Sequence, residues 1–431
     1  MNVLMLGWEF PPLFSGGLGV ATYGLVKALG SSANIRLIVP RNDPSSALKN
    51  VNVIGVSNAL KEQLTREGKQ YNLATLASEV EQIPLTMSPY GFLNQILEEE
   101  EINVPPYSEN PPDEPLALKL GRYFEGSDAY GRDIHRKVYL FSRLADHLSR
   151  RHDFGVIHAH DWVTYPAGVR IKQRTGKPLV LHVHALETDR AGHEVRNAIF
   201  DLEKSALKMA DTIIAVSEYT KDQLRRHYNI SPGRVTVVHN GTDPTDAPRR
   251  IRRLRDKIVV FLGRVTRQKG PEFLLETADK LVRVYPRVKF VVAGTGDEFA
   301  HLLEKTAYQK LGRKFIFTGF LDKQKVNALL SMSDVYFMPS VSEPFGLTAL
   351  EAAQHGVPGV LSRQSGAIEV LPALSADFWD TDKYANCIYA LLSYPALHRE
   401  LADKANVRAK DLTWDRAAAK IASIYHSLTA A

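Results

Sequence analysis

Residues 342–351 read Ser-Glu-Pro-Phe-Gly-Leu-Thr-Ala-Leu-Glu, and two acids of this segment, Glu343 and Glu351, bracket a turn that leads into a helix. The first N–H groups of a helix have no partner within it and carry positive partial charge. Such a terminus binds phosphate groups or sugar hydroxyls. We expect Glu343 just before the helix and Glu351 about two turns inside it, where it accepts hydrogen bonds from hydroxyl groups. The alternative is a capped helix with two solvated acids.

Two cations have the spacing expected of a diphosphate site. Arg264 offers a planar fork of donors, and Lys269 adds a compact charge five residues later, on a turn between a strand and a helix. Near the N-terminus, Gly16 and Gly17 would let the backbone approach a diphosphate closely at the start of another helix. For this glycine pair, a tight turn without a ligand is the alternative.

Four histidines stand at the ends of two strand-like runs. His160 ends the first run, where a side chain can reach a binding site, and His158 points the same way from a deeper position. His182 and His184 repeat this spacing on the next run. A zinc site built from all four is an alternative, but the strands explain these residues without a metal, and we expect no metal site.

Strand-like and helical segments alternate along the chain, and the alternation restarts once. The first set of expected strands is Val3–Leu6, Ile35–Val39, Val156–His158, Leu179–Val183, Thr212–Val216 and Val235–Val238. The second set is Lys257–Leu262, Val288–Ala293, Phe315–Phe317, Val335–Met338 and Val357–Leu361. Such alternation predicts a parallel sheet with helices on both faces. The expected fold class is therefore α/β, with two Rossmann-like, doubly wound domains in tandem.

The domain boundaries follow from the point at which the alternation restarts. We expect an N-terminal domain over residues 1–243, a basic linker over 244–256 and a second domain over 257–412. The terminal helix, within 413–431, is expected to cross back to the first domain. Residues 98–115 hold four consecutive glutamates and five prolines, which predicts a mobile loop and a passive insertion. Gating of an acceptor is the alternative for this insertion.

Composition and charge exclude several classes of protein. The chain has 431 residues, 44% of them hydrophobic, and no run of eighteen apolar residues, which argues against a membrane-spanning helix. The N-terminus looks like a first strand rather than a signal peptide, and the one cysteine, Cys387, excludes an internal disulfide, so we expect the cytoplasm. A formal charge of +6 fits an anionic donor, and no nucleic-acid partner is expected. The arginines within 249–255 are interpreted as a solvated linker, with peripheral contact to an anionic membrane as the alternative.

The segment from Glu343 to Glu351 resembles the E-x7-E signature of retaining glycosyltransferases that use nucleotide-sugar donors, especially glycosyltransferase family 4 and the glycogen synthases. The resemblance extends over most of the chain. Its other motifs are Gly7–Pro12 with Ser15–Gly19, His158–Trp162, Ala215–Ser217, His239–Gly241, and Gly263–Val265 with Lys269–Gly270. The resemblance implies the GT-B fold, in which two doubly wound domains face a central cleft that holds the donor.

The resemblance also implies a role for each site residue. Glu343 would lie beside the transferred sugar and His160 against the donor sugar, while Arg264 and Lys269 would neutralise charge on the leaving phosphate. Donor binding would involve Glu351 on the ribose hydroxyls, together with Gly16, Gly17, Phe345, Gly346, Leu347 and Thr348, whose backbones hold phosphate or sugar oxygens. Front-face attack with retention is implied, with no cofactor and no essential metal.

Two departures from the synthase pattern concern the donor. Phe14 stands where bacterial glycogen synthases carry a lysine, and Glu351 stands where they tend to have tyrosine. Both departures favour family 4 or the archaeal-like synthases. The expected function is transfer of a hexose, glucose, from UDP- or ADP-glucose to the non-reducing end of an α-glucan. The alternative keeps this chemistry and takes a lipid or a small molecule as the acceptor.

Overall fold

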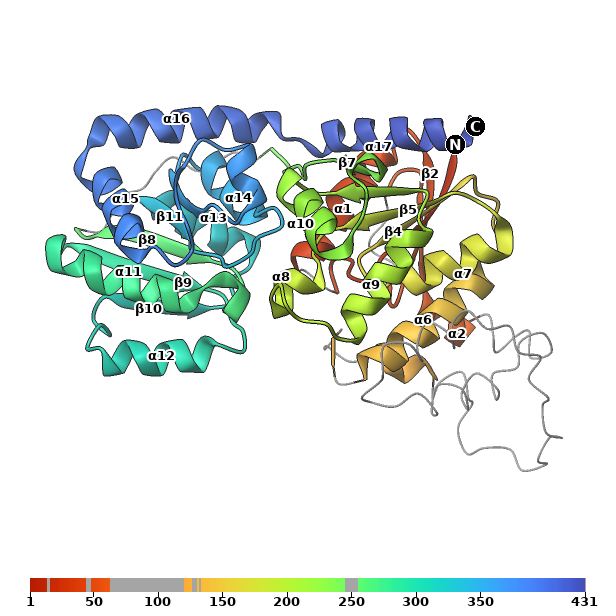
Figure 1. Cartoon of the computed structure of the whole chain (residues 1–431), viewed down its shortest axis with the longest axis horizontal. Helices are drawn as coiled ribbons and strands as arrows, with labels where there is room; N and C mark the ends of the chain where they lie inside the picture. Colours follow the sequence, from red (N-terminus) through yellow and green to blue (C-terminus); the bar gives the residue numbers. More distant parts are fainter. Residues whose placement is uncertain are drawn as a thin grey trace, which may run out of the picture.

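The computed structural model describes residues 1–13, 16–43, 48–62, 120–125, 130–131, 133–244 and 255–430. These residues form two α/β domains that lie side by side, each built on one parallel sheet (Figure 1). The expected fold class, with two Rossmann-like, doubly wound domains, is therefore confirmed. The acidic and proline-rich insertion at 98–115 and linker residues 245–254 lie outside the described residues.

The N-terminal domain holds a seven-stranded sheet in the order β3-β2-β1-β4-β5-β6-β7. Its strands are β1 Asn2–Leu6, β2 Asn34–Val39, β3 Val51–Gly55, β4 Val156–His160, β5 Leu179–Val183, β6 Thr212–Ala215 and β7 Val235–Val237. All neighbouring strands pair in parallel. The strand order reverses between β1 and β4, and ligands of open α/β sheets bind beyond the strand ends at such a point.

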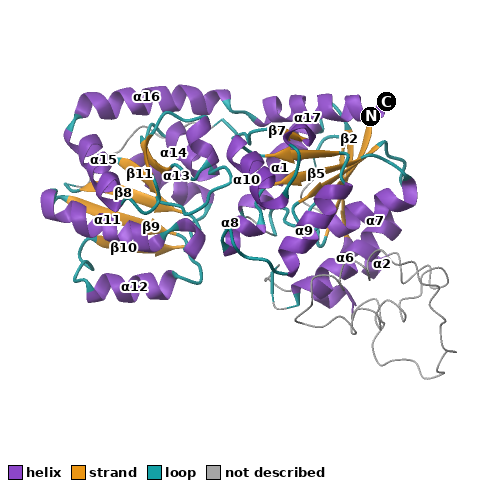
Figure 2. Ribbon diagram, in the orientation of Figure 1, coloured by secondary structure: helices purple, strands orange, loops and turns teal. Residues whose placement is uncertain are grey.

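Helices cover both faces of this sheet (Figure 2). They are α1 Gly17–Leu29, α2 Val56–Glu62, α6 Ile134–Ser149, α7 Tyr165–Thr175, α8 Glu187–Ala191, α9 Ala198–Met209 and α10 Glu218–Tyr228, with short 3-10 turns at Arg122–Phe124 and Pro232–Arg234. One apolar core joins the sheet to α6, α7 and α9, and a second joins its other face to α1. Alternate residues of a strand face opposite sides, so strands such as β1 and β5 contribute to both cores.

The second domain holds a six-stranded sheet in the order β10-β9-β8-β11-β12-β13. Its strands are β8 Lys257–Leu262, β9 Val288–Ala293, β10 Phe315–Gly319, β11 Val335–Met338, β12 Gly359–Ser362 and β13 Leu374–Ala376. Its helices are α11 Pro271–Val284, α12 Phe299–Tyr308, α13 Lys323–Met332, α14 Leu347–Gln354, α15 Thr381–Ser393 and α16 Pro395–Asp411, with 3-10 turns η3 Arg267–Lys269 and η4 Gly366–Glu369.

The last helix, α17 Trp414–Thr429, returns to the N-terminal domain (Figure 1). It packs against α1 and β4, and its apolar face belongs to the same core as α1. The indole of Trp414 lies over Gly24 of α1, where an added Cβ would collide with the ring. The chain therefore crosses twice between the domains. No helix in the described ranges is both long and apolar enough to span a membrane.

Some predicted element bounds are wrong. The sequence interpretation missed β3 and β13, two short strands at sheet edges. The strand predicted to end at His158 runs on to His160, because both residues pair with β5. The strand predicted from Val357 begins only at Gly359, after Pro358, which lacks an N–H group for the ladder. Glu351 is the fifth residue of α14, so it lies one turn inside the helix instead of two.

Candidate functional site

The turn before α14 is held open by one glycine. Gly346 has φ +99°, a left-handed conformation that other residues adopt only with strain, and it forms the N-cap of the helix. Phe345, the residue before it, is buried. The hydroxyl groups of Thr348 and Tyr336 form a hydrogen bond with each other at 2.6 Å. In the described part of the chain, the N–H groups of Leu347 and Thr348 have no acceptor. This helix start can therefore bind an anion or a hydroxyl group.

Glu343 lies next to this turn and contacts Lys269. The Lys269 ammonium donates to the Glu343 carboxylate, whose side chain is only 9% exposed. The Ser340 hydroxyl is a second donor, at 3.4 Å. Gly270 follows with φ +69°, and an added Cβ there would collide with the carbonyl oxygen of Pro339. The sequence-predicted cation and the first of the two predicted acids are thus brought together by a tightly packed pair of loops.

Arg264 and Glu351, the other predicted cation and acid, differ in whether a side chain of the protein already contacts them. The Arg264 side chain is exposed and forms no hydrogen bond with the described residues, which leaves all of its donors for a ligand. Glu351 accepts a hydrogen bond from Lys323 at 2.6 Å. Lys323 begins α13 and is 67% exposed, so this ion pair contributes little to stability. Sequence reasoning did not identify Lys323, since nothing near it in the chain marks it.

The start of α1 holds a carboxylate that sequence reasoning did not assign. The N–H of Gly19 donates to Glu9 at 3.1 Å, and the Tyr130 hydroxyl donates to the same carboxylate at 2.6 Å. A Cβ on Gly16 would collide with Glu9, whereas Gly17 faces open space. Gly16 thus admits a carboxylate at close range. The roles of Gly16 and Gly17 toward a diphosphate stay predictions, and Glu9 sets a negative charge beside them.

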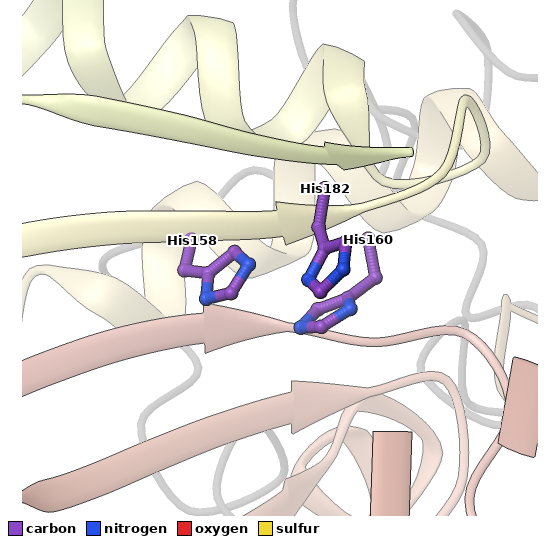
Figure 3. Close-up of side chains that lie close together, drawn as sticks. All are labelled: His158, His160 and His182. Carbon is purple, nitrogen blue, oxygen red and sulfur yellow. The ribbon is translucent and has the colours of Figure 1, made fainter. Parts of the chain in front are cut away.

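The four histidines predicted at the strand ends form a row of stacked rings, with His158 and His160 on β4, His182 on β5 and His184 directly after β5. His158, His160 and His182 lie close together (Figure 3), the first two fully buried and the third nearly so, while His184 is half-buried. The Nδ1 atom of His160 lies 2.9 Å from Nε2 of His184. Burial lowers the pKa of His158 and His184 to about 3, so both rings are neutral at pH 7. The row reaches the surface through His184, and His160 lies behind it.

Asp161 positions the end of this row. Its carboxylate accepts hydrogen bonds from the N–H groups of His184, at 2.7 Å, and Ala185, at 3.3 Å. Its backbone has φ +57°, which turns the chain away from β4 into the loop before α7. Burial raises the pKa of Asp161 to about 7. Asp161 therefore holds the turn after β5, and with it His184, in place.

The two domains touch beside Glu343. The Ser342 hydroxyl donates to Asp189 of α8 at 2.5 Å and lies 2.9 Å from the Tyr219 hydroxyl. Glu369 accepts from the N–H groups of Glu218, at 2.9 Å, and Tyr219, at 2.6 Å. A glutamate of one domain thus caps the start of α10 in the other. These partners lie more than a hundred residues apart, and sequence reasoning did not find them.

One pair of aspartates has the Asp-x-Asp spacing found in some metal sites, and it serves another purpose here. Asp380 caps α15 by accepting from the N–H of Lys383 at 3.0 Å. Asp382 pairs with Lys280 at 2.7 Å. Both carboxylates are therefore engaged in the second domain by a helix start and a lysine.

Comparison with family models finds two matches. The model described as glycosyl transferases group 1 matches residues 244–406, and the model described as glycosyltransferase family 4 matches residues 99–246. An uncharacterised glycosyltransferase of Methanocaldococcus jannaschii is 30% identical over 298 residues, 63% of this chain and 75% of that protein. The glycogen synthase of Mycobacterium tuberculosis is 26% identical over 440 residues, 99% of this chain and 94% of that enzyme. The α-maltose-1-phosphate synthase of Mycolicibacterium smegmatis is 28% identical over 352 residues, 73% and 89% of the two chains.

Solved structures with the same fold include enzymes that hold nucleotides. A sucrose-phosphate synthase from Thermosynechococcus elongatus superposes with a TM-score of 0.70 at 19% identity, covering 100% of this chain and 99% of that one. The catalytic domain of starch synthase IV from Arabidopsis thaliana, bound to ADP and acarbose, gives 0.69 at 15% identity and full coverage of both chains. An Anabaena protein in complex with UDP-glucose gives 0.63 at 16% identity, covering 98% of this chain and 100% of that one.

Proposed function

We propose a specific reaction for this chain, which belongs to the GT-B glycosyltransferases of the glycogen synthase-like type. The proposed reaction is the retaining transfer of glucose from UDP- or ADP-glucose to the non-reducing end of an α-glucan. The observation that carries the proposal is the contact between Lys269 and buried Glu343 beside the open start of α14. A cation, a carboxylate and free N–H groups meet there, as a nucleotide-sugar donor requires.

The donor side of the reaction rests on charge. When the nucleotide leaves, negative charge grows on its phosphate, and prearranged cations and N–H groups stabilise that charge most strongly in the transition state. We assign the diphosphate to Arg264, Lys269 and the N–H groups of residues 345–348, with Gly16 and Gly17 on its other side. Glu351, one turn inside α14, would bind the ribose hydroxyls, exchanging its contact with Lys323 for them.

The sugar side of the reaction rests on Glu343 and the histidine row. Glu343 would accept hydrogen bonds from the transferred sugar once Lys269 turns to the diphosphate. A covalent intermediate has little support, since the neighbouring acid Asp189 is engaged by Ser342 and by the N–H of Leu186. We therefore favour front-face attack, with the leaving phosphate taking the acceptor proton. The burial of His160 favours an indirect role, in which it orients His184 toward the donor.

The acceptor is inferred from similarity to other enzymes. Similarity to the M. tuberculosis glycogen synthase along nearly the whole chain supports an α-glucan. Similarity to an α-maltose-1-phosphate synthase supports a second candidate, a small phosphorylated sugar. The basic run that motivated a membrane-associated acceptor falls mostly within residues 245–254, outside the described residues. A single cysteine fits a reducing compartment, and we propose that the reaction takes place in the cytoplasm.

A screen of donors against acceptors tests the proposed function. Radiolabelled UDP-glucose, ADP-glucose and GDP-mannose would each be incubated with glycogen, with glucose 1-phosphate and with vesicles containing anionic lipid. We expect label from a glucose donor in glycogen, released again by an enzyme that cleaves α-linked glucose. The Lys269→Ala variant serves as the matched control. Label found only in the sugar phosphate or in the lipid fraction would contradict the glucan acceptor while leaving the transfer chemistry intact.

Transfer is expected to proceed without Mg²⁺ or Mn²⁺, because cationic side chains and a helix start provide the charge on the donor side. The rate should therefore be the same, within about two-fold, in Mg²⁺-free buffer with a weak chelator of alkaline-earth ions and in buffer with excess Mg²⁺. Initial rates at saturating donor are the measurement. A rate that disappears without Mg²⁺ and returns with Mg²⁺ alone would contradict this assignment.

A further inference from the structure

Three buried imidazoles lie together on one face of the N-terminal sheet (Figure 3). His158 and His160 are two residues apart on β4, so their side chains point to the same side of the sheet. His182 on β5 pairs in register with His160. His158 and His160 are 0% exposed and His182 is 2% exposed. One ring nitrogen from each of the three lies within 4.8 Å of the others.

The ring nitrogens of this trio are left without partners. The Nε2 atoms of His158 and His160, and both nitrogens of His182, have no hydrogen-bond partner among the described residues. Buried polar atoms are almost always paired, because an unpaired one loses its hydration without compensation. Each neutral ring can offer one lone pair from these atoms, and three lone pairs in one place indicate a ligand that accepts them, which apolar packing does not provide.

The remaining nitrogens of His158 and His160 show how the rings would be arranged around such a ligand. The Nδ1 atom of His158 lies at hydrogen-bond distance from the Tyr425 hydroxyl of α17, and Nδ1 of His160 lies 2.9 Å from His184. Metal-bound histidines usually donate their second ring N–H to such a partner, which fixes the tautomer and the ring. Both outer nitrogens are thus held, while both inner Nε2 atoms are free.

We infer that His158, His160 and His182 form a binding site for one divalent transition-metal ion, Zn²⁺ in the first place. Neutral imidazoles are good ligands for zinc, copper, nickel and cobalt, and three of them are a common zinc set. Mg²⁺ and Ca²⁺ are unsuited, since they require oxygen ligands. A fourth position is left for water. The sequence interpretation preferred a site without metal because the strands explain these residues, but the strands do not explain the unpaired nitrogens.

Metal binding requires a small rearrangement of the rings. Neighbouring rings in the trio are stacked, with interplanar angles of 24°, 9° and 29°. Zn–N bonds of about 2.0–2.1 Å place tetrahedral ligand atoms about 3.3 Å apart. The three ring nitrogens now lie within 4.8 Å of one another, so they would have to move closer together. The ladder fixes the backbone positions on β4 and β5, so this approach requires rotation about the side-chain bonds. The ion would join the two strands and, through His160, hold His184.

The metal site shares His160 with the proposed function, so its test measures metal binding and stability instead of transfer. The purified full-length protein, freed of metal with a strong chelator, would be titrated with Zn²⁺ and, as a spectroscopic probe, with Co²⁺. We expect one zinc per chain by mass spectrometry of the metal, visible absorption typical of four-coordinate Co²⁺, and a rise of the unfolding midpoint by about 5 °C at a hundred-fold excess of Zn²⁺ over its dissociation constant.

The decisive variant is His182→Phe, which keeps a stacked ring and removes two unpaired nitrogens. It should fold at least as well as the metal-free parent, and its zinc affinity should fall by at least about a hundred-fold. His193→Phe is the matched control, because His193 also stacks on a histidine, His227, at 4.8 Å between ring centroids, but is exposed. Unchanged zinc binding in His182→Phe, loss of binding in His193→Phe, or no binding by the parent would each overturn the inference.

Discussion

Replacing Lys269 with alanine is expected to lower kcat/KM by about a hundred-fold, which corresponds to about 2.7 kcal/mol of transition-state stabilisation. The same change at Arg264 should cost at least about ten-fold. The larger effect at Lys269 has a structural reason. Its loss removes a cation from the diphosphate and also leaves the buried Glu343 carboxylate without its cationic partner. Initial rates over a range of donor concentrations provide the measurement.

The control for this experiment is Lys305→Ala. Lys305 also pairs with a glutamate, Glu272, but does so on the surface of α12, with a side chain 40% exposed. Its removal should leave transfer unchanged and cost little stability. All three variants should show the circular dichroism of the parent. Near-normal turnover of Lys269→Ala would refute the diphosphate assignment, whereas a loss of folding would leave Arg264→Ala to decide it.

The arrangement of the fold followed from local patterns. Runs such as Lys257–Leu262 and Val288–Ala293 are rich in apolar and β-branched residues and are separated by helical stretches, so consecutive residues are enough to predict these strands. The strands that were missed are edge strands. Asn52 is exposed in β3, and β13 has only three residues, so neither shows a buried run. An edge strand is defined by the neighbour it pairs with, which a local pattern does not reveal.

The candidate site was predictable where it is built from one segment and not where it is built from several. The turn at Gly346, with an acid before it and a helix after it, follows from ten consecutive residues. Glu9, Lys323 and Glu369 were not predictable in this way, because their partners Tyr130, Glu351 and Glu218 lie in other segments of the chain. The histidines are an intermediate case. Their spacing on two strands was visible, but the register that stacks them, His160 opposite His182, depends on how β4 and β5 pair.

Glu343 and Glu351 are expected to separate chemistry from binding. Glu351→Gln should raise the apparent KM for the donor several-fold and leave kcat nearly unchanged, because ribose hydroxyls are bound equally in the substrate and the transition state. Glu343→Gln should lower kcat by about ten-fold or more, since Glu343 lies buried beside Lys269, where charge and geometry change during transfer. Glutamine keeps the shape of both side chains, and the lost pair with exposed Lys323 costs little stability. Donor titrations on the two variants are the measurement: a reversed pattern, or the same pattern in both, would show that these two acids are assigned to the wrong parts of the donor.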